Sequence, residues 1–370
     1  MLRNGVEIFP ALLEAIEGAH DTIEFETYVY WSGDIALRMA TALADAARRG
    51  VEVRVLLDAV GSIPMDGDAR RILDDSPAEV REFGPMARLK FWQLTRRTHR
   101  KILVCDDAVG FTGGVGIAEE WEGDGGEPGS WRESHFRIRG PAVRALRAEF
   151  FDHWCGLPGG EGGSLPDTLL RPGPGMQPGT DGNAEGEADV MVVPSRPSDS
   201  WARTRTIFRT LLQTADERVR ICTAYFVPSP DLVDVLCDTS RRGVDVEILL
   251  PGPYIDFRVC QFAGEAVYDD LMDAGVRIWR YQPTMLHAKV ATVDGQVSCI
   301  GSANLNHRSM QRDDELSLLV ADRSFTARLD AHFERDLERS EQVEPGQEWQ
   351  GRGWLRKAAA HLSRMVRHEL

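Results

Sequence analysis

Two short stretches of the sequence share one pattern of chemically capable side chains. HRKILVCD runs from His99 to Asp106, and HAKVATVD runs from His287 to Asp294, so both read His-x-Lys-x4-Asp. Lysine is otherwise rare, because the 43 lysine and arginine residues include only four lysines and two of these belong to the pattern. A compact ammonium group is thus used at two equivalent places, and arginine is no substitute for it beside a phosphate oxygen.

These residue types indicate transfer of a phosphoryl-type group without a metal. Side chains two apart on a strand share a face, so each histidine should point the same way as its lysine, Lys101 or Lys289. One histidine can attack phosphorus and form a phosphohistidine, while the other protonates the leaving alcohol and deprotonates the incoming one. The lysines would stabilise charge on the non-bridging oxygens. Asp106 and Asp294, near the strand ends, could orient a histidine or balance the positive charge.

A glycine-containing turn follows each pattern. FTGGVGIAEEW contains Gly113 and Gly114, and CIGSANLNHRS contains Gly301, Ser302 and Asn304. Glycine lets the backbone approach a ligand closely, and exposed backbone amides can bind oxyanions. The serine and asparagine would add side-chain donors. Both turns are therefore predicted to bind phosphate.

The segments before the two patterns also resemble each other. Residues 48–57 read RRGVEVRVLL and residues 241–250 read RRGVDVEILL, and each follows an amphipathic helical stretch. Strands alternating with helices in this order predict a mixed α/β sheet in each half. Residues 156–191 are rich in glycine, proline and acidic residues, which is typical of a linker. The predicted division is a first catalytic half at 1–155, the linker at 156–191, a second catalytic half at 192–340 and a C-terminal tail at 341–370.

Charge and composition argue against several functions. The net charge of −15 disfavours bulk nucleic-acid binding. The six cysteines are scattered without a CxxC pair, which argues against a zinc site and favours buried free thiols in a reducing compartment. The sequence shows neither a signal peptide nor a run approaching the roughly 18 apolar residues that span a bilayer. We therefore expect a cytoplasmic protein that needs no metal and no cofactor.

At these residues the sequence resembles the phospholipase D superfamily, and more narrowly the bacterial cardiolipin synthases. HRKILVCDDAVGFTGGVGIAEEW, followed by WRESHFRIRGPAV, is similar to the family's first catalytic half, and MLHAKVATVDGQVSCIGSANLNHRSMQRDDEL is similar to the second. The resemblance covers nearly the whole chain. It implies two similar halves, each a mixed β-sheet flanked by helices, related by a pseudo-twofold axis with the active site at their junction. The catalytic residues that it implies are His99, Lys101, Asp106, His287, Lys289 and Asp294.

The resemblance also assigns residues around these motifs. Ser302 and Asn304, with Gly114 of the first half, correspond to the phosphate-binding turns. Glu315 corresponds to a carboxylate that supports a histidine, and Glu133 of WRESH has the equivalent place in the first half.

Some positions depart from the family pattern. Gly116 stands where the family usually has asparagine, so one phosphate-side donor is expected to be missing from the first half. Glu133 and Asp313 stand where aspartate and asparagine are usual. The chain also resembles the shorter cardiolipin synthases, which lack N-terminal transmembrane helices.

The function that the resemblance implies is that of a phosphatidyltransferase. It would make cardiolipin from phosphatidylglycerol and a second phospholipid, phosphatidylethanolamine among the candidates, through a phosphohistidine. The alternative is a phospholipase D that hydrolyses phospholipids to phosphatidic acid with the same residues. A phosphodiesterase nuclease is less favoured because the sequence has no extended basic stripe, and a non-catalytic lipid-binding scaffold is disfavoured by the intact histidines and lysines. Nucleic acid is not an expected partner.

Such an enzyme would be peripheral, on the cytoplasmic side of the cell membrane, and three features could contact lipid. Five tryptophans could form an interfacial rim or pack in the core. Residues 86–101, MARLKFWQLTRRTHRK, could contact anionic lipid or form a basic rim around the phosphate site. The basic amphipathic tail at 341–370 could lie on the membrane or dock onto the second half. The tryptophans are Trp31, Trp92, Trp121, Trp131 and Trp354.

Overall fold

The computed structural model describes residues 1–84, 97–157, 187–196 and 201–344 of the chain. The chain divides into two compact units. The first unit contains residues 1–124, 133–187 and 314–316, and the second contains residues 125–132, 188–313 and 317–370. The first unit extends beyond the predicted half 1–155 to residue 187, and the second extends beyond 192–340 to residues 188 and 370. Within the predicted halves, two short segments, 125–132 and 314–316, belong to the other unit. Each of these segments belongs to one unit although its neighbours in the sequence belong to the other.

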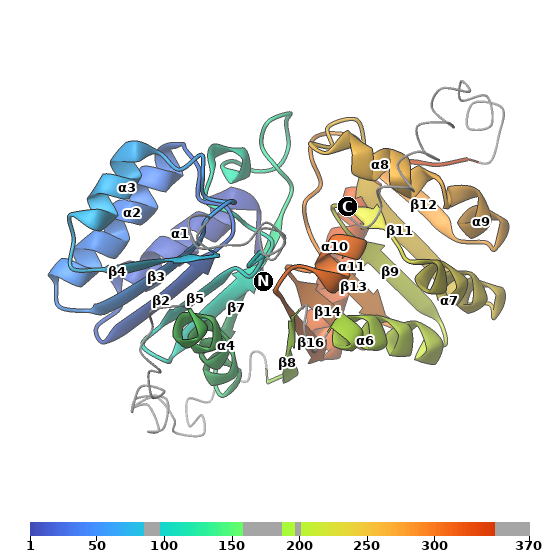
Figure 1. Ribbon diagram of the computed structural model, residues 1–370. Helices are drawn as coiled ribbons and strands as arrows, with labels where there is room; N and C mark the ends of the chain where they lie inside the picture. The colour runs from blue at the N-terminus through green and yellow to red at the C-terminus, as the bar shows by residue number, and fades with distance from the viewer. Residues whose placement is uncertain (85–96, 158–186, 197–200, 345–370) are drawn as a thin grey trace. The chain divides into compact units, whose positions relative to one another are not determined.

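The first unit contains a seven-stranded sheet in the order β1-β7-β6-β5-β2-β3-β4 (Figure 1). Strands β2, β3 and β4 are parallel, and the remaining neighbours pair in antiparallel fashion. The elements are β1 (Leu2–Arg3), α1 (Asn4–Glu17), β2 (Thr22–Thr27), α2 (Asp34–Arg48), β3 (Glu52–Asp58), α3 (Gly67–Asp74), β4 (Glu79–Phe83), β5 (Ile102–Cys105), β6 (Val109–Gly113), the 3₁₀ turn η3 (Glu119–Trp121), β7 (Ser134–Arg139) and α4 (Ala142–Gly156).

The second unit contains an eight-stranded sheet in the order β17-β12-β11-β9-β13-β14-β16-β8, and a small parallel pair of β10 and β15. The elements are β8 (Asp189–Ser195), α6 (Trp201–Thr214), β9 (Arg218–Cys222), β10 (Phe226–Val227), α7 (Pro230–Arg241), β11 (Asp245–Pro251), α8 (Arg258–Glu265), α9 (Tyr268–Asp273), β12 (Arg277–Tyr281), β13 (Val290–Val293), β14 (Val297–Gly301), β15 (Leu305–Asn306), α10 (His307–Gln311), β16 (Glu315–Ala321), α11 (Arg323–Leu337) and β17 (Ser340–Gln342).

The two large sheets have the same topology. When β2 is matched with β9, the strand order of the first sheet is reproduced in the second, and β17 is an addition at one edge. The strand directions agree as well, because β9, β11 and β12 are parallel while β13 and β14 run antiparallel to their neighbours. The predicted fold class, a mixed α/β sheet flanked by helices in each of two similar halves, is confirmed. The pseudo-twofold axis between the halves stays a prediction.

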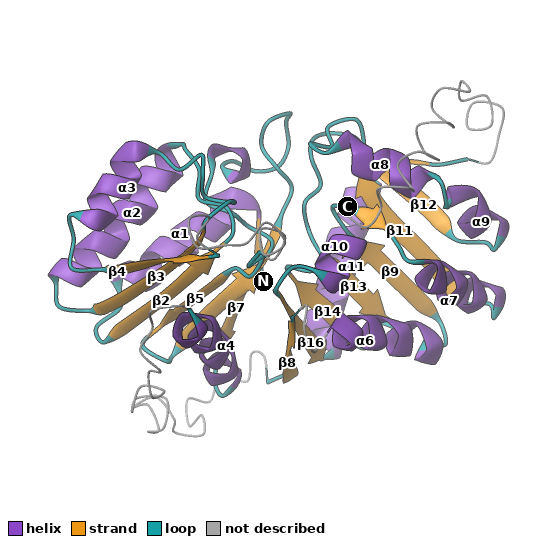
Figure 2. Ribbon diagram, in the orientation of Figure 1, coloured by secondary structure: helices purple, strands orange, loops and turns teal. Residues whose placement is uncertain are grey.

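One face of each sheet carries the apolar core. Ile23 and Phe25 of β2 are at most 4% exposed, and they alternate with Glu24 and Glu26, which point to the opposite face. Helices lie over both faces of the sheet (Figure 2). In the second unit, apolar residues of β9 and β11 pack with α7 in one buried cluster. The opposite face of β2 therefore carries polar side chains, whereas the opposite face of the second sheet carries polar residues together with a smaller apolar cluster that includes Phe333 of α11.

Matched positions on these opposite faces carry opposite charges in the two sheets. Glu24 of β2 is fully buried and lies 2.8 Å from the Arg147 guanidinium of α4. Burial raises the pKa of Glu24, although Arg147 and Arg54 oppose the shift. In the second unit Arg220 has the place of Glu24, and it lies 3.6 Å from Asp330 of α11. In the first unit the carboxylate is thus on the sheet and the arginine on the helix, whereas in the second unit the arginine is on the sheet and the carboxylate on the helix.

Other residues singled out from the sequence can also be placed. All six cysteines are free and five are buried, as predicted. Trp121 is only 2% exposed, so it packs in the core and does not belong to an interfacial rim. In the part of the chain that the structure describes, no helix is long and apolar enough to cross a membrane. The tail from residue 345 onward and most of residues 86–101 lie outside the described residues.

Candidate active site

The first motif places His99 and Lys101 just before β5, in the first unit. The backbone amide of His99 donates a hydrogen bond to the carbonyl oxygen of Asp314 at 2.8 Å, so residues 314–316 lie beside the motif. The imidazole Nδ1 then lies 2.9 and 3.0 Å from the two carboxylate oxygens of Glu315. The Tyr28 ring packs edge-on at 5.1 Å between ring centroids. Because Nδ1 is engaged by Glu315, Nε2 is the nitrogen through which His99 would react.

The second motif is arranged in a similar way in the second unit. Here the neighbouring segment comes from the N-terminal part of the chain, whereas the segment beside His99 comes from the C-terminal part. The backbone amide of His287 donates to the carbonyl oxygen of Arg132 at 2.8 Å, so residues 125–132 lie beside this motif. The imidazole is 5% exposed. Its centroid is 5.2 Å from the ring of Trp131 and 6.3 Å from that of Tyr225. Each histidine is therefore held by a segment that comes from a distant part of the chain.

Each lysine lies against the backbone of its own motif histidine, just before β5 or β13 begins. The Lys101 ammonium donates to the carbonyl oxygen of His99 at 2.8 Å, and the Lys289 ammonium donates to that of His287. The Lys289 ammonium is also 2.8 Å from Nδ1 of His287. Both lysines are only 4% exposed. In the second unit the imidazole and the ammonium group thus lie as a pair, and a shared face for His99 and Lys101 stays a prediction.

The aspartates of the motifs do not lie beside these pairs. The Asp294 carboxylate accepts hydrogen bonds from the backbone amides of residues 216, 217 and 218 at 2.8 to 3.0 Å, where β9 begins. The Asp106 carboxylate accepts the equivalent three from residues 20, 21 and 22 before β2. Lys289 and Asp294 are five positions apart along the strand, which is roughly 16 Å. The suggestion that these aspartates orient a histidine or balance a lysine is therefore corrected: they fasten the turn after β5 or β13 to the neighbouring strand.

The Asp294→Asn variant should lose stability without losing its reaction. Asparagine tolerates the left-handed backbone at this position, where φ is 52°, but its NH₂ group would face an amide donor. We expect a loss of about 1–3 kcal/mol in the free energy of unfolding by denaturant titration, and nearly unchanged turnover per folded molecule. Asp234→Asn, at an exposed position of α7, is the matched control. A large loss of turnover with unchanged stability would restore a catalytic role.

The pH dependence of this variant follows from the same contacts. Burial opposes the charge of Asp294, but the three backbone amides outweigh it and hold the pKa below its ordinary value of 3.8. A depressed pKa stabilises the fold fully above pH 3.8, and this contribution is lost as the pH falls through the lowered pKa. The variant should therefore lose less stability on acidification than the parent chain does.

The glycine turn of the first motif makes room for a carboxylate. A Cβ atom on Gly114 would lie 2.4 Å from a carboxylate oxygen of Glu133, which is fully buried. The backbone amide of Glu133 in turn donates to the Asn4 side chain at 3.0 Å. A Cβ on Gly116 would lie 2.8 Å from Val29 and 3.0 Å from the Trp121 ring, so the usual asparagine does not fit there. The turn of the first unit is therefore shaped by packing, and a phosphate-binding role for Gly114 stays a prediction.

The second turn is polar. Ser302 is fully buried and Asn304 is 2% exposed, both just after β14. Oδ1 of Asn304 is buried without a hydrogen-bond partner among the described residues. A buried amide with an unsatisfied oxygen is costly unless a ligand completes its contacts. Asp313, which stands where asparagine is usual, pairs with Arg308 at 2.9 Å instead.

Residues 125–132 and 314–316 each belong to a different unit from their neighbours in the sequence, and we call them the exchanged segments. Two buried ion pairs that the sequence did not indicate anchor them. In the first unit His153 of α4 lies 2.6 Å from Glu26 and 3.7 Å from Asp314, the residue before Glu315. Burial and Arg100 lower the pKa of His153, but Glu26 and Asp314 outweigh them and the net shift is upward.

In the second unit Asp336 of α11 binds Arg132, the residue before Glu133, at 2.9 Å. The anchors therefore carry opposite charges in the two units, and each suits only its own segment. The sequence does contain one signal that could have identified these two anchors, which is their equal spacing. His153 follows Arg147 by six residues, and Asp336 follows Asp330 by six.

The comparisons with known proteins agree with this arrangement. The family model described as "Cardiolipin synthase, PLD-like domain" matches residues 12–123 and 208–337. The chain is 32% identical to a cardiolipin synthase of Geobacillus sp. (strain WCH70) over 349 residues, which cover 93% of this chain and 67% of that relative. It is 31% identical to cardiolipin synthase A of Pseudomonas putida (strain GB-1), covering 93% and 69% of the two chains.

A solved structure shows the same fold at low sequence identity. The crystal structure of phosphatidylserine synthase from Haemophilus influenzae Rd KW20 superposes with a TM-score of 0.68 and 15% identity, covering 100% of this chain and 95% of that one. Together with the family model and the curated relatives, the repeated sheets and the paired His-x-Lys sites confirm the resemblance found in the sequence. The chain belongs to the cardiolipin synthase family of phospholipase D-like proteins.

Proposed function

We propose that this chain is a phosphatidyltransferase that makes cardiolipin from phosphatidylglycerol and a second phospholipid. The observation that carries the proposal is the repeated His-x-Lys motif, in which the lysine ammonium of each unit donates to the backbone carbonyl oxygen of its own histidine, in a family whose curated relatives are named cardiolipin synthases. A nucleophile, a proton carrier and two cations for the phosphate oxygens are the groups that exchange of one alcohol for another at phosphorus requires.

In the first step Nε2 of His99 attacks the phosphorus of the donor lipid. A bond forms between nitrogen and phosphorus, and the bond from phosphorus to the headgroup oxygen breaks. That oxygen takes a proton from His287 and leaves as the free alcohol. Glu315 at 2.9 Å from Nδ1 supports this role, because a carboxylate there orients the ring and stabilises the positive charge that develops on it.

In the second step the hydroxyl of a phosphatidylglycerol replaces the histidine. His287, now neutral, accepts the hydroxyl proton while the oxygen attacks phosphorus, and the bond to His99 breaks. The Lys289 ammonium lies 2.8 Å from Nδ1 of His287. A bound phosphodiester would give this ammonium an anionic partner. Lys101, Ser302 and Asn304 are proposed to share the remaining phosphate contacts.

The test is incubation of purified protein with phosphatidylglycerol vesicles, followed by mass spectrometry of the lipids. We expect cardiolipin and free glycerol in equal amounts, with the same yield in the presence of EDTA. Phosphatidic acid without cardiolipin would replace transfer with hydrolysis by the same residues. If neither phosphatidylglycerol nor phosphatidylethanolamine is consumed, the lipid function is wrong, and single-stranded nucleic acid becomes the next substrate to try.

A further inference from the structure

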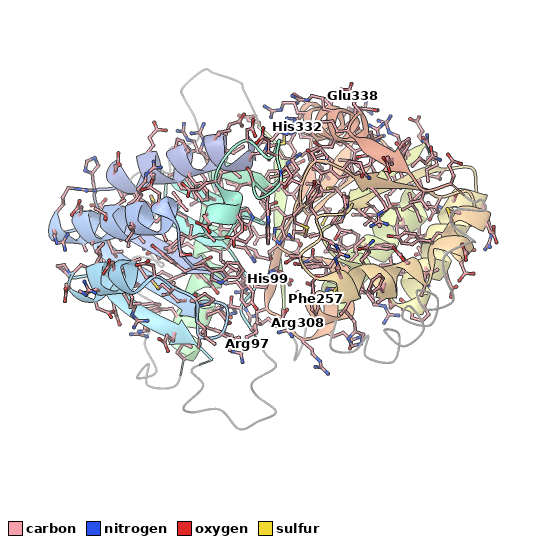
Figure 3. The ribbon with its side chains drawn as sticks, turned by 90° about the horizontal axis from the view of Figure 1, so that it is seen from above. Arg97, His99, Phe257, Arg308, His332 and Glu338 are labelled. Atoms are coloured by element: carbon pink, nitrogen blue, oxygen red, sulfur yellow. The ribbon has the colours of Figure 1, made fainter. Side chains whose placement is uncertain are left out.

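An exposed apolar patch lies on the loop before α8 and on the first turn of this helix. Seven large apolar side chains are exposed in the described ranges, and three of them fall within six consecutive residues: Tyr254, Phe257 and Val259 are 45%, 47% and 37% exposed. Phe257 is labelled in Figure 3. Single exposed apolar residues need no explanation, whereas a cluster marks an interaction surface. The other four are scattered: Val6, Leu37, Ile63 and Met191.

The patch is held on a fixed base. Ile255, between the exposed aromatic residues, is 7% exposed and packs with Ala224 and Met285. Cys260 and Ala263 of α8 are each 3% exposed and pack beneath the helix. The loop and α8 therefore bury some of their apolar side chains in the core and still expose three to solvent.

The same loop contacts the residues that surround His287. The Tyr225 hydroxyl donates to the Asp256 carboxylate, with its oxygen 2.7 and 2.9 Å from the two carboxylate oxygens. The Tyr225 ring is 6.3 Å from the His287 ring, edge to face. Trp131, which packs against Ile255 and its cluster, is 5.2 Å from the same histidine. The patch is thus one residue layer away from the second motif.

We propose that residues 253–259 form a lipid-docking surface that enters the interfacial layer of a bilayer and presents phospholipid to His287. The inference rests on the proposed function, because a lipid substrate must leave its bilayer beside the reacting histidine. Aromatic rings with a neighbouring arginine suit the headgroup region, and Arg258 is exposed between Phe257 and Val259. The net charge of −15 opposes attraction to an anionic membrane, so apolar insertion has to supply the affinity.

The test is flotation with vesicles of phosphatidylglycerol and phosphatidylethanolamine. The double variant Tyr254→Ser and Phe257→Ser should bind the vesicles at least about tenfold more weakly than the parent, because two half-exposed aromatic side chains no longer enter the lipid. Met191→Ser, which removes an equally exposed apolar side chain from the same unit, is the matched control and should bind as the parent does. Binding of the parent chain should persist at high salt, since it does not depend on charge.

A second measurement separates this inference from the proposed reaction. Turnover of vesicles is divided by turnover of a dispersed short-chain phosphatidylglycerol, and the ratio should fall in the double variant by the same factor as binding. Unchanged flotation of the double variant would overturn the inference and move lipid attachment to another segment, such as the tail at 341–370. Weakened flotation of the double variant, together with no turnover of either lipid form by the parent chain, would leave the docking surface standing and reject the phosphatidyltransferase.

Discussion

Asparagine in place of His287 should lower cardiolipin formation by about 10²–10⁴-fold, because no group then protonates the departing alcohol. A donor with a 4-nitrophenyl leaving group needs no such proton, so the variant should still form the bond between phosphorus and His99. The adduct should accumulate, because asparagine cannot deprotonate the acceptor hydroxyl. Mass spectrometry of the quenched and digested variant should therefore find a phosphatidyl group on residue 99.

Asparagine in place of His99 should give neither adduct nor cardiolipin, since removal of a nucleophile costs at least as much as removal of the proton carrier. His20→Asn, at an exposed position of the first unit, controls for histidine replacement and should leave turnover unchanged. An adduct on residue 287 in the His99 variant would reverse the two roles. Adducts in both variants would mean that either histidine can attack.

Local pattern was sufficient to predict the repeated architecture. The segments RRGVEVRVLL and RRGVDVEILL do end α2 and α7 and lead into β3 and β11, because a glycine turn followed by apolar alternation has few other solutions. The His-x-Lys spacing was also informative, since in both motifs the lysine reaches the backbone carbonyl oxygen of its own histidine just before a strand begins.

The contacts that complete each site depend on pairings that no local pattern specifies. Glu315 lies 216 positions after His99 in the sequence and nevertheless contacts it, because residues 314–316 belong to the first unit although their neighbours in the sequence belong to the second. The turn aspartates were misread for a related reason. Their spacing from the histidine fixes only the strand end, whereas their partners are backbone amides, which a sequence does not display.

Buried charges explain how the exchanged segments reach the correct unit. Asp314 meets His153 in the first unit, and Arg132 meets Asp336 in the second. The opposite choice would place Arg132 against a histidine and Asp314 against a carboxylate, and an unpaired buried charge is strongly destabilising. Charge reversal between two otherwise similar units thus selects one pairing of segments, and the position of Glu315 depends on that selection.

Glutamine in place of Glu315 should therefore affect the reaction more than the fold. Its amide can donate to Nδ1 of His99, which would put the proton on Nε2 and block attack on phosphorus. We expect turnover to fall by about 10²–10⁴-fold with little change in the substrate concentration at half-saturation, as loss of a carboxylate beside a catalytic imidazole does elsewhere. Rates over a range of phosphatidylglycerol concentrations, with thermal unfolding measured in parallel, test this.

Glu247→Gln is the matched control for this variant. Glu247 is 2% exposed and pairs with Arg220 at 3.1 Å, and it contacts neither motif histidine. Replacing this buried carboxylate should lower the free energy of unfolding about as much as replacing Glu315 does. It should lower stability while turnover per folded molecule is kept. Equal losses of turnover in the two variants would mean that Glu315 acts through folding alone, and the carboxylate would then have no place in the reaction. Partial recovery in Glu315→Asp, where the charge returns on a shorter side chain, would instead fix the negative charge beside Nδ1 as the quantity that the reaction needs.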